Sequence, residues 1–323
     1  MNVGEIIRKR PRVVVLGDLL LDMYTFGEIS RISPEAPVPI LEVRRREQRL
    51  GGSGNVMLNL CALELDCIPF GRIGQDLHGK AVRAELDKKS LRSDFLLESQ
   101  TLPTITKHRM VARNQQVIRI DEEKIEFMSQ SEEDKVIQNF LSIVDELDVV
   151  VLSDYGKGFL SDRLLKKIIQ ISREHLKPIV VDPKGCDFTR YRGATTITPN
   201  LKEAQFAAPR ARELSEIAET LIEQADLQFL MMTRSEDGLS YFKIHNGQLE
   251  HEQFPVQVQE VIDVTGAGDT VVAVTALALA RHWDFRLMCQ AANIAAGYVV
   301  GHFGAATIPW KELEAQLQSK GLL

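Results

Sequence analysis

The chain has 323 residues, of which 44% are apolar and 26% are charged. These proportions are ordinary for a soluble globular enzyme and exclude collagen-like, coiled-coil and largely disordered chains. Acidic residues outnumber basic ones by 45 to 39, which gives a net charge of −6. Because no sustained basic run is present, nucleic acid is not expected as the main partner.

The first apolar stretch, which begins at Val13, is interrupted by Asp18 and Asp22 and does not read as an export signal. No uncharged apolar run approaches the roughly 18 residues of a membrane span. Four cysteines are spread along the chain: Cys61, Cys67, Cys186 and Cys289. They form no Cys-x-x-Cys pair, so we expect all four to be reduced and to pack as small buried hydrophobic residues, in a reducing compartment. The sequence predicts a cytoplasmic protein that does not associate with membranes.

Short apolar runs recur along the chain, at residues 13–16, 149–152, 179–181 and 229–232. Such runs are typical of parallel strands that are covered on both faces. Helix-periodic stretches lie between them, and residues 214–222 carry one apolar stripe. This alternation predicts an α/β fold with a doubly wound, mostly parallel sheet and helices on both faces.

Two segments break the alternation. Residues 22–45 contain three prolines and read as extended, and residues 103–121 are polar and rich in β-forming residues. We expect both to form a small antiparallel layer, a β-strand lid that covers a cleft. No long linker or internal repeat is present, so residues 1–323 are predicted to form a single domain.

The strongest local motif is Gly266-Ala267-Gly268-Asp269, which precedes an apolar helix expected over residues 271–280. Backbone N–H groups at the start of a helix bind phosphate. A carboxylate at the same point is placed to take a proton from an attacking hydroxyl. The alternative is a tight strand-to-helix turn in which Asp269 only caps the helix.

A second glycine cluster, which includes Gly51 and Gly52, leads through Asn55 into another helix-periodic stretch. Small residues permit close approach of a ligand, and the Asn55 amide suits a hydroxyl group; a flexible turn is the alternative. Asp18 and Asp22 flank the end of the first strand, the edge where α/β sheets bind ligands. Paired carboxylates there suit sugar hydroxyls. The alternative is that both carboxylates are surface groups solvated by water and bind no ligand.

Asn200 and Glu203 follow a short strand and are three residues apart, so they share one face of a first helical turn. An amide and a carboxylate so placed suit a hydrated Mg²⁺ ion. A capping box explains the same spacing without a metal. The histidines have no zinc-binding spacing, and the glycine pattern of a dinucleotide site is missing after the first strand.

Taken together and in this order, these motifs resemble those of the ribokinase-like (PfkB) carbohydrate kinases, over nearly the whole chain. Within that family the chain looks most like the D-glycero-β-D-manno-heptose-7-phosphate kinases of lipopolysaccharide core biosynthesis. The stretches that carry the closer resemblance are residues 31–39, 104–107, 113–116 with Arg119 and Asp121, 153–158, 182–185 and 198–200.

The resemblance implies a role for each matching residue. Asp269 would be the catalytic base, with Gly266, Ala267 and Gly268 as the anion hole. The residues implied in substrate binding are Asp18, Asp22, Gly51, Gly52, Asn55, Arg113, Gln116, Arg119, Asp154, Lys157 and Lys184. Those implied in ATP binding are Asn200, Glu203, Thr233, Gly238, Thr265 and Asn293. Glu203 would also hold Mg²⁺, through a water molecule.

The implied reaction is ATP-dependent phosphorylation of D-glycero-D-manno-heptose 7-phosphate at its anomeric (C1) hydroxyl, to give the 1,7-bisphosphate. ATP and Mg²⁺ are expected, the resemblance also allows for a monovalent cation, and the family implies a homodimer built through the lid. Another sugar or sugar-phosphate kinase of the family is one alternative; a catalytically inactive sugar-binding regulator is another. Residues 308–323 read as one amphipathic helix, so no nucleotidyltransferase domain is expected in this chain.

Overall fold

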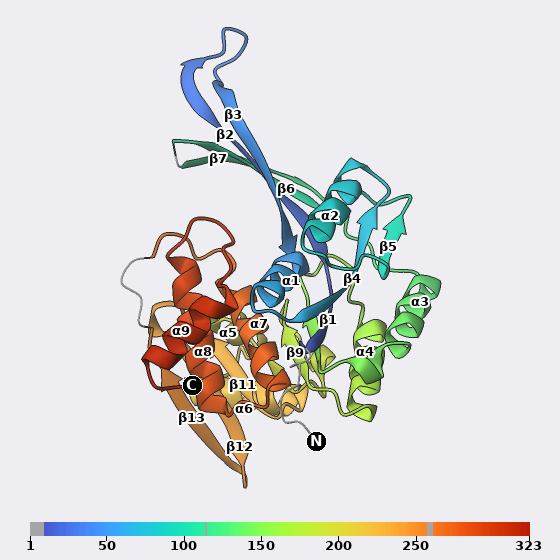
Figure 1. Ribbon diagram of the computed structural model, residues 1–323, viewed down its shortest axis with the longest axis vertical. Coiled ribbons are helices and arrows are strands. Elements are labelled where there is room, and N and C mark those ends of the chain that lie inside the picture. Colours follow the sequence, from blue (N-terminus) through green and yellow to red (C-terminus); the bar gives the residue numbers. More distant parts are fainter. Residues whose placement is uncertain (1–9, 114, 257–260) are drawn as a thin grey trace, which may run out of the picture.

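A parallel sheet forms the centre of the protein in the computed structural model, which describes residues 10–113, 115–256 and 261–323. Its described strands lie in the order β10-β9-β8-β1-β4-β5 (Figure 1). They are β1 (Arg12–Gly17), β4 (Asp66–Gly74), β5 (Leu96–Ser99), β8 (Val149–Ser153), β9 (Ile179–Asp182) and β10 (Thr196–Ile197). All the pairings are parallel, as the short apolar runs predicted.

Helices cover both faces of this sheet, and successive residues of β1 point into opposite cores. Val13 and Val15 pack into one core, which contains residues of α1 (Ser53–Ala62), α2 (Leu77–Lys88), α7 (Ala267–Ala280), α8 (Phe285–Val300) and α9 (Trp310–Ser319). Val14 and Leu16 pack into the other, with residues of α3 (Gln130–Leu141), α4 (Asp162–Glu174), α5 (Leu201–Ala207) and α6 (Leu214–Ala225). The doubly wound α/β fold is therefore confirmed. None of the described helices is long and apolar enough to cross a membrane.

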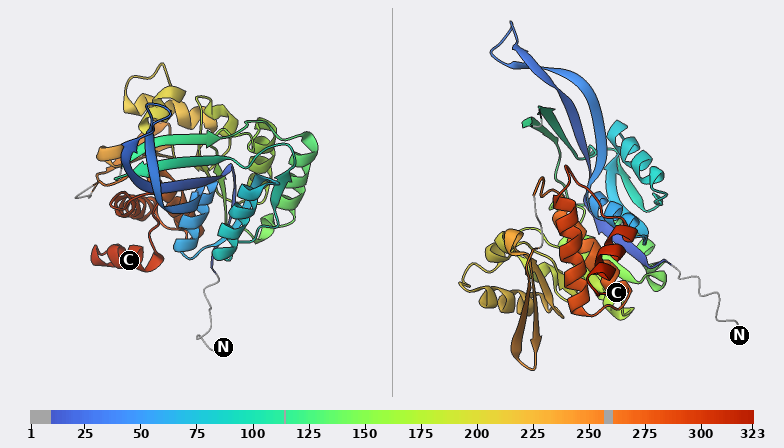
Figure 2. Two further views of the ribbon diagram at one scale, coloured as in Figure 1. Left: turned by 90° about the horizontal axis from the view of Figure 1, so that it is seen from above. Right: turned by 60° about the vertical axis from the view of Figure 1, so that its left-hand side comes forward.

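A second sheet rises from the body as the lid (Figures 1 and 2). Its described strands lie in the order β3-β2-β6-β7. They are β2 (Leu19–Ile32), β3 (Pro39–Gly52), β6 (Thr106–Ala112) and β7 (Gln115–Glu122). The lid strands reach further than residues 22–45, because β2 starts just after β1 and β3 runs down to α1.

The expectation of a purely antiparallel lid is wrong in one pairing. β2 pairs with β6 in parallel, with Leu21 opposite Thr106, whereas β2–β3 and β6–β7 are antiparallel. Both β2 and β6 leave the body at the same place and run outward side by side, so their directions match (Figure 1). Only the strands that return from the lid tips can run antiparallel.

The run at residues 229–232 lies parallel to the β10 edge of the central sheet, joined by backbone hydrogen bonds and by one bridge between Asn200 and Thr233, but it is not one of the ordered strands of that sheet. It forms β11 (Leu230–Thr233), which pairs antiparallel with β12 (Leu239–His245), and β12 pairs antiparallel with β13 (Gln248–Phe254). Met231 packs into one core, and its neighbours Leu230 and Met232 pack into the other. Both faces of the strand are therefore apolar, and it lacks the alternation of apolar and polar residues that marks most antiparallel strands. Short 3-10 helices complete the described fold at Val144–Glu146, Phe188–Tyr191 and Ser235–Asp237.

The cysteines only partly match their prediction. Cys67 and Cys289 are buried and Cys61 is half-buried, but Cys186 is exposed in the loop after β9. That loop follows the carboxyl end of a sheet strand, where the chain turns outward into solvent. None of the four forms a disulfide.

Candidate active site

Most of the predicted site residues converge at the carboxyl edge of the parallel sheet, the edge where open α/β sheets bind ligands. A cavity of about 190 Å³ lies there, between the ends of β8 and β9 and the start of α7. The predicted residues that line it are Asp154, Lys184, Asn200, Glu203, Thr233, Gly266, Gly268 and Asp269. Residues far apart in the sequence thus meet around one space.

Asp269 lies in the first turn of α7 and is buried, with 8% of its surface exposed. The helix begins at Ala267, four residues earlier than expected, because Gly266 takes the N-cap position in a left-handed conformation with φ of 84°. Asp269 is therefore not the cap. Its carboxylate is held from two sides: Asn55 Nδ2 donates to Oδ2 at 2.6 Å, and the Tyr155 hydroxyl donates to Oδ1 at 2.8 Å.

The environment of Asp269 suits a general base. Burial raises the pKa of its carboxyl group to about 6, against the opposing effect of the hydrogen bonds from Asn55 and Tyr155, and the nearby charge of Asp22 adds to the rise. A base works best when its pKa lies close to the operating pH. At neutral pH the carboxylate is mostly ionised yet still basic enough to accept a proton.

Gly51 and Gly52 allow the base of the lid to pack closely against the start of α1. A Cβ atom on Gly51 would lie 2.1 Å from Asp22 Oδ2, and Gly52, with φ of 58°, forms the N-cap of α1. Asp22 itself makes an ion pair with Arg109 across β2 and β6. The cluster therefore is a close-packed joint between the lid and α1, which sets Asn55 against Asp269.

Asp18 directly follows β1, as expected, but its hydrogen-bond partners were not predicted. It is 3% exposed, and its two carboxylate oxygens accept hydrogen bonds from the backbone N–H groups of Tyr155, Lys157 and Phe159, at 2.9–3.1 Å. These bonds hold the loop after β8 against the end of β1. Asp18 therefore supports the site through this loop, and its direct contact with a sugar hydroxyl stays a prediction.

Replacing Asp18 with alanine is expected to destabilise the protein by about 3–5 kcal/mol, because three buried backbone donors lose their charged acceptor. Chemical denaturation measures this loss. Asp162→Ala is the matched control: its side chain is 84% exposed in an ion pair with Arg190, so its loss should cost less than about 1 kcal/mol. Equal losses in the two variants would show that the Asp18 bonds do not hold the loop.

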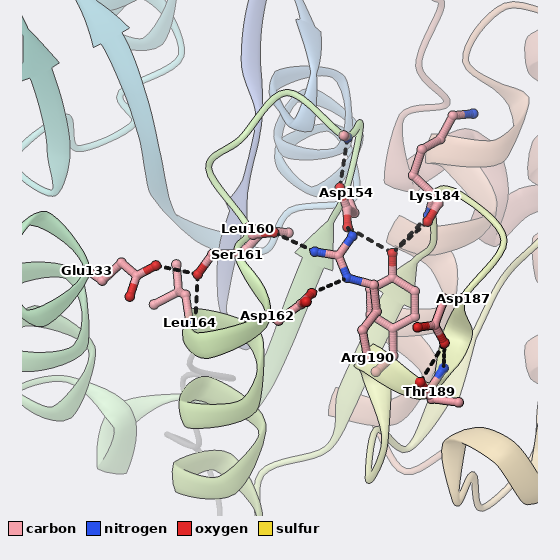
Figure 3. Close-up of polar contacts among 12 residues, drawn as sticks. Glu133, Asp154, Leu160, Ser161, Asp162, Leu164, Lys184, Asp187, Thr189 and Arg190 are labelled. Carbon is pink, nitrogen blue, oxygen red and sulfur yellow. Dashed lines mark hydrogen bonds and ion pairs between the residues drawn. The ribbon is translucent and has the colours of Figure 1, made fainter. Parts of the chain in front are cut away.

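The carboxylate of Asp154 is likewise held by neighbouring groups of the protein (Figure 3). Its oxygens accept hydrogen bonds from Gly156 N and the Tyr191 hydroxyl, both at 2.8 Å, and it pairs with Arg190 at 3.2 Å. Burial raises the pKa of the Asp154 carboxyl group, although these donors act in the opposite direction. Asp154 lines the cavity, but its partners make it a support for the loop; its contact with substrate stays a prediction.

Asn200 and Glu203 form the capping box that the sequence left open as an alternative. Glu203 N donates to Asn200 Oδ1 at 2.9 Å, and Asn200 N donates to Glu203 Oε2 at 3.1 Å. Glu203 also makes an ion pair with Lys184 at 2.9 Å. The lysine implied in substrate binding and the carboxylate implied in Mg²⁺ binding thus neutralise each other.

A second cavity, of about 530 Å³, adjoins the first and shares Asn200, Thr233 and Gly268 with it. Gly238, Ala267 and Asn293 also line it, together with the apolar side chains of Val256, Val261, Val264, Val271, Ala296 and Val300. Its size is in the range of small-molecule sites. Asn293 Nδ2 donates to the carbonyl oxygen of Pro255 at 2.7 Å, which fixes the amide at the rim. Thr265 lies beside this cavity, in the turn before α7, where its N–H donates to Asp263.

The lid residues predicted to bind substrate lie apart from both cavities. Gln116 and Arg119 are exposed on β7, and Arg119 pairs with Asp121 at 2.8 Å. Arg113 is exposed in the turn before β7, with φ of 47°, next to residue 114, which lies outside the described residues. The structure does not bring these three side chains to Asp269, and their role stays a prediction.

Lys157 belongs to the loop that Asp18 holds. Its ammonium group pairs with Glu123 at 2.7 Å, just beyond the end of β7. It therefore links this loop to the lid. A neighbouring hollow is lined by Lys157 together with Arg72 and Lys124.

Two site residues had no role in the sequence prediction. Tyr155 contacts the proposed base, and Asp182 lines the same cavity at the end of β9. Burial and the charges of Asp269 and Glu203 raise the pKa of the Asp182 carboxyl group. Both lie in stretches that carried the closer resemblance; Asp182 is the last residue of β9, and Tyr155 lies two residues after β8. That position at the carboxyl edge was the available signal.

Known structures share this architecture. Ribokinase from Arabidopsis thaliana, complexed with ribose and ATP, has a TM-score of 0.71 and 20% identity, covering 96% of this chain and 99% of that chain. Phosphofructokinase-2 from Escherichia coli, in complex with potassium, has a TM-score of 0.77 and 16% identity, with coverage of 96% and 99%. At these identities the likeness shows the ribokinase-like fold.

Relatives found by sequence comparison have a higher identity to this chain than these solved structures have. The chain is 41% identical over 314 residues to the bifunctional protein HldE of Histophilus somni and 42% identical over 315 residues to that of Haemophilus influenzae. These matches cover 96% and 97% of this chain, which spans 64% of the length of each relative. Residues 10–312 match the pfkB family carbohydrate kinases. The chain therefore belongs to the pfkB family of carbohydrate kinases.

Proposed function

We propose that the chain phosphorylates D-glycero-D-manno-heptose 7-phosphate at its anomeric hydroxyl, with ATP as the donor, to give the 1,7-bisphosphate. The observation that carries the kinase chemistry is the buried carboxylate of Asp269, clamped at the start of α7 beside a nucleotide-sized cavity. The heptose assignment rests on the HldE relatives and on the sequence resemblance. It would place the chain in ADP-heptose synthesis for the lipopolysaccharide inner core.

In this proposal ATP occupies the larger cavity, with its adenine toward Asn293 and its terminal phosphate toward Asp269. The acceptor hydroxyl gives its proton to Asp269 while its oxygen bonds to the γ-phosphorus. The bond from that phosphorus to the β–γ bridging oxygen breaks, and ADP leaves. In this proposal the backbone N–H groups of Gly266, Ala267 and Gly268 stabilise the charge that develops on the transferring group, although that of Ala267 also donates to Val264 O at 3.3 Å. Phosphoryl transfer needs chiefly this positioning and charge stabilisation.

The carboxylates around the smaller cavity fit a bound Mg²⁺ ion. Within the described residues, no group of three or more His, Cys, Asp or Glu side chains could hold a metal by itself. Mg²⁺ typically takes only one or two carboxylates, together with phosphate oxygens and water. Glu203 would hold the ion through a water molecule, and the mutual repulsion of Asp182, Glu203 and Asp269 would fall. When bound, Mg²⁺ neutralises charge on the nucleotide phosphates.

The remaining parts of the proposal concern the surroundings of the site. The potassium complex of phosphofructokinase-2 supports the binding of a monovalent cation. A homodimer through the lid is supported by apolar side chains that the lid exposes, among them Ile32, Val38 and Ile118. We place the enzyme in the cytoplasm, and we propose only the kinase step for residues 1–323.

A coupled assay of ADP release tests the substrate. The acceptors are hexoses, pentoses, fructose 1-phosphate and heptose 7-phosphate, each with ATP and Mg²⁺. We expect strong selectivity for the heptose phosphate. Activity on fructose phosphates alone would identify another sugar-phosphate kinase of the family. Sugar binding without release of ADP in the presence of any acceptor would identify a regulator without turnover.

A further inference from the structure

We propose that Tyr155 is a positioning residue for Asp269: its hydroxyl group orients the carboxylate toward the acceptor and keeps it ionised. This inference rests on the proposed kinase function. Tyr155 donates to Oδ1 at 2.8 Å, while Asn55 donates to Oδ2 at 2.6 Å. A carboxylate oxygen accepts two hydrogen bonds, so each oxygen keeps one lone pair. The carboxylate is therefore fixed from two sides and still free to accept the acceptor proton.

The backbone that carries Tyr155 is itself held in place. Asp18, buried beneath the loop, accepts from Tyr155 N at 3.1 Å and from the N–H groups of Lys157 and Phe159. On the other side, the Gly156 N–H donates to Asp154, which Arg190 and Tyr191 hold in turn (Figure 3). A phenol on a loop anchored at both sides is suited to orient another side chain.

Tyr155 stays a donor throughout the pH range in which Asp269 titrates. Burial, followed by the negative charge of Asp269, raises the pKa of the Tyr155 phenol well above its usual value. The other charges that face the site come from different elements: Asp22 on β2, Asp182 at the end of β9, and the Lys184–Glu203 pair. The carboxylates among them favour protonation of Asp269, whereas Tyr155 and Asn55 oppose it.

The Tyr155→Phe variant removes only this hydroxyl group. The acidic limb of the pH profile of kcat/KM, expected near pH 6 in the wild type, should move upward by about one unit. At pH 8, above both values, kcat should still be about tenfold lower, because the carboxylate is no longer oriented. KM for ATP should not change. The matched control is Tyr241→Phe, at a buried tyrosine of β12 that packs on Phe229 and Phe285.

A titration of the wild-type protein gives a readout that does not depend on activity or on the stability of the variant. The chain has five tyrosines, so with ¹³Cζ-tyrosine labelling the Tyr155 signal is assigned by single Phe variants of the other four. We expect this signal to shift with a midpoint near pH 6, as Asp269 titrates beside it.

The two proposals fail in different ways. A wild-type protein that releases no ADP with any sugar phosphate would contradict the proposed function, while a Tyr155 signal that titrates near pH 6 would still confirm its contact with Asp269. An active enzyme whose Tyr155 signal does not titrate there, or whose Tyr155→Phe variant keeps the wild-type pH profile, would overturn the role of Tyr155.

Discussion

Replacing Asp269 with asparagine is expected to lower kcat by about 10²–10⁴-fold or more, because the amide cannot accept the acceptor proton. ATP binding should survive, since the backbone N–H groups at the start of α7 are unchanged. Steady-state kinetics and calorimetric titration with ATP measure the two effects separately. A variant that keeps more than about half of the wild-type kcat would refute the assignment, because its barrier would have changed by less than about 0.5 kcal/mol.

The control for this substitution is Asp162→Asn. Asp162 lies in the first turn of α4, with a side chain that is 84% exposed. It offers the same chemical change at a helix start away from the cavities, so kcat should stay at the wild-type value. A similar loss of kcat in both variants would point to a general effect of the Asp-to-Asn change.

Gly266→Ala is expected to lower kcat by about 10²-fold and stability by about 1–3 kcal/mol. Gly266 has φ of 84°, which costs an L-residue energy, and an added Cβ would lie 2.8 Å from Asn55 Nδ2. The Asn55 amide would have to move, and it would leave Asp269 without one of its two donors. Steady-state kinetics and thermal unfolding measure the two losses.

Gly247→Ala separates backbone strain from the effect on the site. Gly247 has φ of 75° in the turn between β12 and β13, and an added Cβ would meet no atom within 4 Å. This variant should lose about 1–2 kcal/mol of stability and keep its kcat. If Gly266→Ala behaved in the same way, the contact between Gly266 and Asn55 would have no part in catalysis.

Much of the fold could be predicted because burial leaves a mark in the sequence. Runs such as residues 13–16 are apolar on both faces, and only a strand covered by helices on both sides explains them. The same reasoning is only half right for residues 229–232, because β11 borders the sheet through a parallel bridge at Asn200 but pairs antiparallel with β12 on its other side. A local pattern reports how much a strand is buried and does not report the direction of its neighbour.

The candidate site could be predicted only where its residues lie in local sequence motifs. Asp269 and Glu203 lie in motifs whose spacing has a chemical meaning, whereas Tyr155 acts through a contact across 114 residues of sequence that no local pattern contains. Asp18 shows a second limit of local patterns. A carboxylate after the first strand suggests a ligand, but its oxygens accept three backbone N–H groups, and only the fold reveals those partners.

Phosphorus NMR of the reaction products shows which hydroxyl of the heptose phosphate receives the phosphoryl group. The protein is incubated with ATP, Mg²⁺ and heptose 7-phosphate, and the Asp269→Asn variant is run in parallel. We expect ADP together with a new phosphate resonance coupled to the anomeric proton, formed by the wild type and not by the variant. A new phosphate on any other hydroxyl, or unchanged heptose 7-phosphate with the wild type, would contradict the proposed function.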